Sequence, residues 1–111
     1  MVGYRKGASF ENLVKDILIN DGWLAIRSAG SHSIIDVLAI NANEKWIIQC
    51  RTSGNLSGNE RKELITLAEK HKATPVLAYK SKGNIVFEEI KSKIPTFHYE
   101  VVEGRFIKIN G

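Results

Sequence analysis

Asp36-Val-Leu-Ala-Ile-Asn-Ala-Asn-Glu-Lys-Trp-Ile-Ile-Gln-Cys-Arg51 is the stretch of sequence that decides the fold. It contains two apolar runs, residues 36–40 and 45–51, and the turn-forming residues 41–44 separate them. Short apolar runs on either side of a polar turn are typical of two paired strands. The stretch therefore predicts an antiparallel β-hairpin.

The second run of this hairpin ends in two polar side chains, Gln49 and Arg51. Side chains two residues apart on a strand share a face, so these two are expected to project together. The opposite face would be directed toward the core and would carry Trp46, Ile48 and Cys50. Polar groups at the end of an apolar strand mark the point where it reaches solvent, and Asp36 on the paired run can converge on that point.

The residues before the hairpin predict a helix, a strand and a loop. Five apolar residues recur at helical spacing before a turn at residues 21–22: Phe10, Leu13, Val14, Ile17 and Leu18. The stretch 23–27 is short, apolar and β-prone, and the small polar residues 28–33 follow it as a loop. The strand 23–27 and the two strands of the hairpin would form a meander.

The residues after the hairpin predict a second helix and a β-rich tail. Residues 52–58 have the composition of a loop, and Asn59 is expected to cap a helix that has Leu64, Leu67, Ala68 and His71 on one face. Strands are expected at 74–79 and 85–90, around a turn at 81–84, with a last hairpin at 99–109 around Glu103-Gly104. This order predicts an α/β fold, a mixed sheet flanked by helices, in a single domain spanning residues 1–111.

Composition and charge restrict the classes of function. The 111 residues include 16 Lys and Arg against 12 Asp and Glu, a net charge of +4 that favours a polyanionic partner only weakly. Cys50 is the only cysteine, which excludes an internal disulfide and a cysteine-cluster metal site. The chain has no apolar signal core and no run long enough to span a membrane, so we expect a cytoplasmic protein, in the host cytoplasm if the source is viral.

The polar residues of the hairpin could form a hydrolytic site. Hydrolysis of a phosphodiester needs oxygen ligands for a divalent cation and a positive group near the phosphate. Asp36, Gln49, Arg51 and Glu11 can supply such a set. An acid, an amide and an arginine near a sheet edge are common on solvated strands, however, so their spacing alone does not decide between the two interpretations.

Four short segments, in order, carry a resemblance to a known family: Arg5-Lys-Gly-Ala-Ser-Phe-Glu11, Arg27-Ser-Ala-Gly-Ser31, Ile35-Asp-Val-Leu-Ala39 and Ile48-Gln-Cys-Arg-Thr-Ser53. Together they resemble the signature of archaeal-type Holliday junction resolvases, including viral and phage members. The resemblance covers the N-terminal half of the chain. It implies the restriction-endonuclease-like fold of the PD-(D/E)XK nucleases and an endodeoxyribonuclease that resolves four-way junctions in DNA recombination and repair.

The resemblance also implies roles for individual residues. Asp36 and the backbone carbonyl of Cys50 would bind Mg²⁺, which Mn²⁺ could replace, and Gln49 could add a carbonyl oxygen. Glu11 matches a helix glutamate that reaches the metal directly or through water, although a plain ion pair of Glu11 with Lys15 is the alternative. Arg51 would complete the catalytic set by orienting the attacking water or neutralising charge on the phosphate.

Further residues would contact DNA. Arg5 and Lys6 match basic residues that meet backbone phosphates, and Arg27 belongs to the same proposed DNA-binding set. Ser31 matches a loop serine near the cut strand and is a candidate for both DNA binding and catalysis, with a simple turn serine as an equal alternative. His32, beside it, is more simply explained as a solvated loop histidine.

The chain departs from the superfamily where Gln49-Cys-Arg51 replaces Glu-x-Lys. Gln49 removes a negative charge, and Arg51 is a bidentate phosphate-binding group rather than a compact ammonium. Three alternatives to a junction resolvase therefore stay open: a nuclease for other branched or nicked DNA, a DNA-binding homologue with weak or no catalysis, and a protein without a DNA role. Since a four-way junction must be cut at two paired positions, we also expect a homodimer.

Overall fold

The predicted hairpin is formed by β2 (Val37–Ile40) and β3 (Lys45–Cys50), which pair antiparallel. The computed structural model describes residues 6–28, 34–53, 55–90, 98–102 and 105–108. In the turn between the two strands, the Asn41 side-chain oxygen accepts the backbone N–H groups of Asn43 and Glu44 at 2.8 and 2.7 Å. The Asn41 N–H also donates to the Glu44 carbonyl at 2.9 Å, so side chain and backbone close the turn together.

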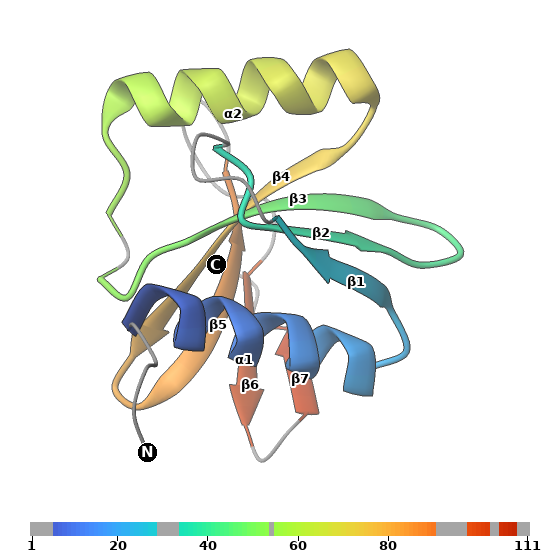
Figure 1. Ribbon diagram of the computed structural model, residues 1–111, viewed down its shortest axis with the longest axis vertical. Coiled ribbons are helices and arrows are strands. Elements are labelled where there is room, and N and C mark those ends of the chain that lie inside the picture. The colour runs from blue at the N-terminus through green and yellow to red at the C-terminus, as the bar shows by residue number, and fades with distance from the viewer. Residues whose placement is uncertain (1–5, 29–33, 54, 91–97, 103–104, 109–111) are drawn as a thin grey trace.

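The sheet has seven strands in sequence order, from β1 to β7. β1 (Leu24–Arg27) joins β2 and β3 in the predicted meander, and β3 then pairs parallel with β4 (Thr74–Ser81). All the other neighbours are antiparallel: β5 (Asn84–Glu89), β6 (His98–Val102) and β7 (Arg105–Lys108) complete the sheet. The mixed α/β sheet and the hairpin in the tail are confirmed, and Figure 1 shows that the sheet is curled rather than flat.

A parallel pair of strands needs a crossover, and α2 (Gly58–His71) provides it between β3 and β4. The predicted cap was wrong by two residues: Ser57 is the N-cap, and Asn59 lies in the first turn of the helix. The Ser57 hydroxyl accepts the backbone N–H of Glu60, and the Glu60 carboxylate accepts the N–H of Ser57, which makes a capping box. Of the face predicted for this helix, Leu64 and Ala68 are buried, whereas His71 is exposed.

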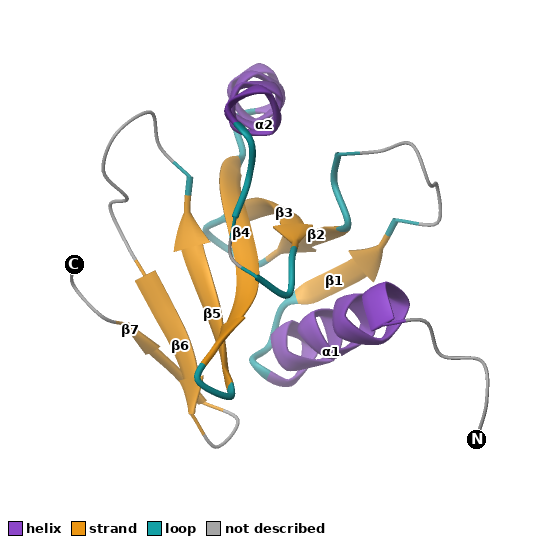
Figure 2. Cartoon of the chain, turned by 90° about the vertical axis from the view of Figure 1, so that its left-hand side faces the viewer, coloured by secondary structure: helices purple, strands orange, loops and turns teal. Residues whose placement is uncertain are grey.

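The two faces of β3 carry different cores. Trp46 and Ile48 lie in the core beneath α1 (Lys6–Asn20), and Cys50 packs against it, whereas Ile47 lies in the core beneath α2. Figure 2 shows α1 against the β1 end of the sheet and α2 against the other side of its centre. The shared face predicted for Trp46, Ile48 and Cys50 is therefore confirmed, whereas Gln49, which was expected where the strand reaches solvent, is buried on the α2 side.

The α1 core is centred on Trp46, which is almost fully buried. Its ring lies 4.5 Å from the Trp23 ring, 5.8 Å from that of Tyr99 and 6.4 Å from that of Phe106, measured between centroids. The last two residues belong to β6 and β7, so the C-terminal tail completes the core. No helix within the described ranges is long and apolar enough to cross a membrane.

Removal of the cap should weaken α2. We expect Ser57→Ala to lower the free energy of unfolding by about 1 kcal/mol, because the N–H of Glu60 loses its acceptor. Chemical denaturation followed by circular dichroism measures the change. Asn59→Ala is the matched control and should have a smaller effect. A larger loss of stability for Asn59→Ala than for Ser57→Ala would show that Asn59 is the N-cap.

Candidate metal and phosphate site

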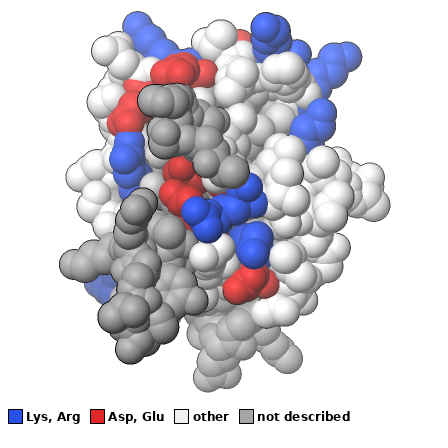
Figure 3. Space-filling model, viewed as in Figure 1, with Lys and Arg blue, Asp and Glu red and all other residues white. Residues whose placement is uncertain are grey.

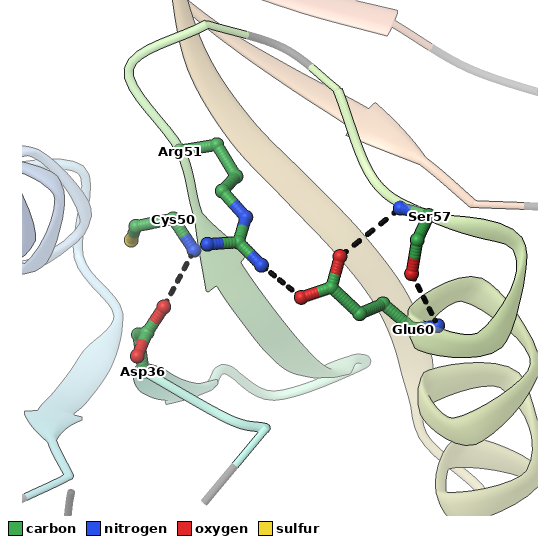
Figure 4. Close-up of polar contacts among 5 residues, drawn as sticks. All are labelled: Asp36, Cys50, Arg51, Ser57 and Glu60. Atoms are coloured by element: carbon green, nitrogen blue, oxygen red, sulfur yellow. Dashed lines mark hydrogen bonds and ion pairs between the residues drawn. The ribbon is translucent and has the colours of Figure 1, made fainter.

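Asp36 immediately precedes β2 and is fixed by backbone hydrogen bonds. Its own N–H donates to the Ile48 carbonyl at 2.8 Å, and its carboxylate accepts the N–H of Cys50 at 2.8 Å. Figure 4 shows this carboxylate below the end of β3, on the same side as Cys50 N. The carboxylate is therefore held where β3 ends, and the convergence expected from the hairpin is present.

Glu11 reaches the same place from α1. The Nε of Arg27 donates to its carboxylate at 3.2 Å, and another guanidinium nitrogen of Arg27 donates to the Asn12 side chain at 3.3 Å. Burial, and then the negative charge of Asp36, raise the pKa of Glu11, while the Arg27 charge opposes the rise. Glu11 and Asp36 therefore lie close enough to interact electrostatically. The alternative ion pair of Glu11 with Lys15 is not formed, because Lys15 Nζ lies 3.7 Å from an Asp16 carboxylate oxygen instead.

Asp36 is also made less acidic by its surroundings. Burial raises its pKa, while hydrogen bonds from Cys50 and Glu11 and the positive charges of Arg51 and Arg27 act in the opposite direction. Figure 3 shows acidic and basic side chains in contact near the middle of the face seen in Figure 1. Two carboxylates that both resist ionisation can share a proton or a cation.

The Cys50 thiol is not an anionic ligand. Burial, and then the charges of Asp36 and Glu11, raise the pKa of this thiol, so it stays protonated. Its side chain packs against the α1 core. A metal-binding role for Cys50 is therefore restricted to its backbone carbonyl.

Gln49 is the one polar residue among the buried residues of the described ranges, with 6% of its surface exposed. Its side-chain oxygen has no hydrogen-bond partner within those ranges. Buried oxygens almost always have a partner, so this oxygen is a candidate ligand for a water or a cation. No hydrogen bond of the described residues joins Gln49 to Glu11 or Asp36, so the structure brings it to the same strand end but not into the same network.

Arg51 points toward α2. A terminal guanidinium nitrogen of Arg51 donates to the Glu60 carboxylate, which is the acid of the capping box (Figure 4). The charge of Arg51 also acts on Asp36. Glu60 was missed in the sequence, although the pattern Ser57-x-x-Glu60 is recognisable as a capping box and would have placed this acid at the start of the helix.

Not all of the predicted DNA-binding residues belong to the part of the chain that the structure describes. Arg5, Ser31 and His32 lie outside the described residues, and Lys6 begins α1 with a side chain that is also outside them. Arg27 is placed, and it contacts Glu11 and Asn12. The structure thus brings together Glu11, Arg27, Asp36, Arg51 and the backbone of Cys50.

The sequence matches the model of one protein family over most of its length. The model of the archaeal Holliday junction resolvase family, Hjc, matches residues 2–103. The chain belongs to the Hjc family. Membership assigns it the function of a Holliday junction resolvase, a crossover junction endodeoxyribonuclease.

Individual relatives agree with this membership. The chain is 31% identical to the crossover junction endodeoxyribonuclease Hjc of Methanocaldococcus jannaschii, and the match covers 96% of this chain and 95% of that protein. Its fold is similar to that of Archaeoglobus fulgidus Hjc, a Holliday junction resolvase, with a TM-score of 0.67 and 28% identity. That match covers 96% of this chain and 84% of the solved one. The fold class expected from the resemblance is therefore confirmed.

The burial of the two carboxylates should cost stability at neutral pH. Because folding raises the pKa of both Glu11 and Asp36, the folded state holds their protons more tightly than the unfolded state, and stability falls as the pH rises through the raised values. Asp36→Asn keeps an acceptor for Cys50 N–H but removes one charge. We expect it to unfold at a higher temperature than the parent at neutral pH.

Thermal unfolding across a pH series measures this effect. The difference should shrink as the pH falls toward the ordinary carboxyl values of 3.8 and 4.5. Glu69→Gln, at an exposed position on α2, is the control and should show no such trend. A variant less stable than the parent at neutral pH would show that the buried charge of Asp36 does not cost stability.

Proposed function

We propose that this resolvase cleaves four-way DNA junctions by metal-dependent hydrolysis at the site around Asp36, as a single nuclease domain working in the cytoplasm. The observation that carries the proposal is the pair of carboxylates, Glu11 and Asp36, held against each other with raised pKa values. The charge of Arg27 acts on both carboxylates, and the charge of Arg51 acts on Asp36. In such an arrangement the paired carboxylates can bind a metal cation, and the nearby guanidinium groups can bind a phosphate.

The donor atoms fit Mg²⁺, with Mn²⁺ as a substitute. Both ions prefer oxygen ligands. Within the described ranges no three His, Cys, Asp or Glu side chains form a metal-binding group, so two carboxylates need neutral oxygens beside them. The unpartnered oxygen of Gln49 and the carbonyl of Cys50 are the candidates. When bound, the ion would polarise the phosphate and lower the pKa of an attacking water.

The chain's own residues would then hold the substrate. The Cys50 N–H fixes the Asp36 carboxylate, so this ligand would need no rearrangement. Arg51 would bind the oxygens of the scissile phosphate through guanidinium nitrogens that are not engaged by Glu60. Arg5, Lys6, Arg27 and Ser31 would contact the DNA backbone and would read the shape of the junction rather than its sequence.

The substitution Asp36→Asn tests the proposed reaction. It should abolish Mg²⁺-dependent cleavage of a labelled four-way junction, because an anionic ligand is lost, while junction binding stays measurable in a gel-shift assay. Chelation of the metal should abolish cleavage by the parent in the same way. Full activity of this variant would remove Asp36 from the site.

The same assay separates the competing functions. Four-way, flap, nicked and plain duplex substrates are compared at equal concentration, and preferential cleavage of flap or nicked DNA would favour a nuclease with another branched substrate. The exchange of Glu-x-Lys for Gln49-Cys-Arg51 favours a second candidate, a homologue that binds junctions without cutting them. Junction binding by a parent that is inert with Mg²⁺ and with Mn²⁺ would support that candidate.

We further propose that the protein acts as a homodimer that uses the apolar face of the edge strand β1. The register pairs Leu24 with Ile40 and Ile26 with Leu38, so these four side chains share the face opposite α1. Leu24 is 68% exposed and Ile26 is 56% exposed. Exposed apolar side chains grouped on one sheet face are typical of protein interfaces. A second copy fits the need for two paired cuts in one junction.

A charge on this face should separate the subunits. We expect sedimentation to give a dimer for the parent and a monomer for Ile26→Asp, because the carboxylate cannot be buried without a partner. Ile107→Asp, on the opposite edge strand β7 and also exposed, is the matched control and should stay dimeric. A monomeric Ile107 variant beside a dimeric Ile26 variant would move the interface to β7, and a parent that is monomeric with and without junction DNA would contradict the dimer.

A further inference from the structure

The contact between Arg51 and Glu60 joins the end of β3 to the start of α2. A guanidinium nitrogen of Arg51 donates to one carboxylate oxygen of Glu60. In the view of Figure 4 the guanidinium lies between the carboxylates of Asp36 and Glu60. Arg51 is thus held by an acid outside the proposed metal ligands.

Glu60 is itself fixed before it meets Arg51. Its backbone N–H donates to the Ser57 hydroxyl at 3.1 Å, and its other carboxylate oxygen accepts the Ser57 N–H at 3.0 Å. The side chain therefore has little freedom, and the oxygen that faces Arg51 has a defined position.

Helix capping does not account for the Arg51 contact. The capping box is complete with Ser57 and Glu60 alone, and an ion pair whose side chains are 36% and 32% exposed contributes little to stability. A long arginine side chain has many rotamers, and one fixed acceptor selects among them. Arg51 has five N–H donors, so others remain available for a phosphate.

We propose that Glu60 is a positioning residue of the nuclease reaction, which holds the Arg51 guanidinium in place for the scissile phosphate. The inference rests on the proposed function, since it gives Arg51 a role only if a phosphate binds beside Asp36. Glu60 is not proposed to touch the metal or the DNA. Glu60 would restrict the motion of the long Arg51 side chain, which stands where the superfamily has a lysine.

Glu60→Gln tests this role because it separates the two functions of the side chain. Gln also completes a capping box, with its oxygen on the Ser57 N–H. Its NH₂ group would then face Arg51, which can only donate, so the contact is lost while the cap is kept. Under single-turnover conditions with Mg²⁺ we expect the cleavage rate constant to fall about tenfold, with half-saturation by junction DNA changed less than about twofold.

Three further variants control the measurement. Glu63→Gln makes the same change of charge one turn away on α2 and should cleave like the parent. Ser57→Ala weakens the cap but leaves the Arg51–Glu60 contact, so its rate should exceed that of Glu60→Gln even if its stability is lower. In an Arg51→Gln background, Glu60→Gln should cause no additional loss, because its effect passes through Arg51.

The outcomes distinguish this inference from the proposed function. Parent activity that is lost in Asp36→Asn and retained in Glu60→Gln would overturn the positioning role alone. An equal loss for Ser57→Ala and Glu60→Gln, or an undiminished loss in the Arg51→Gln background, would also overturn it. A parent without metal-dependent cleavage, or an active Asp36→Asn variant, would overturn both.

Discussion

The alternation of side chains along β3 is the constraint on which the rest of the structure depends. Trp46 and Ile48 point into the α1 core and Ile47 into the α2 core, so neither face of the strand is free to change places with the other. A shift of register by one residue would move Trp46 out of the α1 core to the α2 side and would put Gln49 into the α1 core. The hydrogen bond from Cys50 N–H to Asp36 adds a polar contact that only this register satisfies.

The local parts of the fold could be predicted from the sequence because their signals are local. The period of two in residues 45–51 and the helical spacing of Phe10, Val14 and Leu18 each describe one element and its buried face. The cap of α2 was misplaced since Ser57 and Asn59 are both good capping residues. Only Ser57 has a glutamate three residues later that can complete a capping box, and this signal appears only when Ser57 and Glu60 are considered together.

Contacts between distant segments could not be predicted in the same way. No pattern in the sequence links Trp46 to Tyr99 and Phe106, which complete its aromatic surroundings from strands more than fifty residues away. For the candidate site, the family resemblance indicated Glu11 and Asp36, but it gave no partner for Arg51. The Arg51–Glu60 contact depends on where the loop after β3 turns back, which is set by the packing of α2 on β4.

The candidate site therefore depends on both helical layers and not on the hairpin alone. Glu11 comes from α1 and holds Arg27, while Glu60 comes from α2 and holds Arg51, with Asp36 influenced by both arginines. An arginine that is held by a glutamate keeps its positive charge near the site. Its remaining guanidinium donors are still available to bind an anion. The sheet sets the separation of the two pairs, so the packing of α1 and α2 on opposite faces determines where a phosphate can meet the carboxylates.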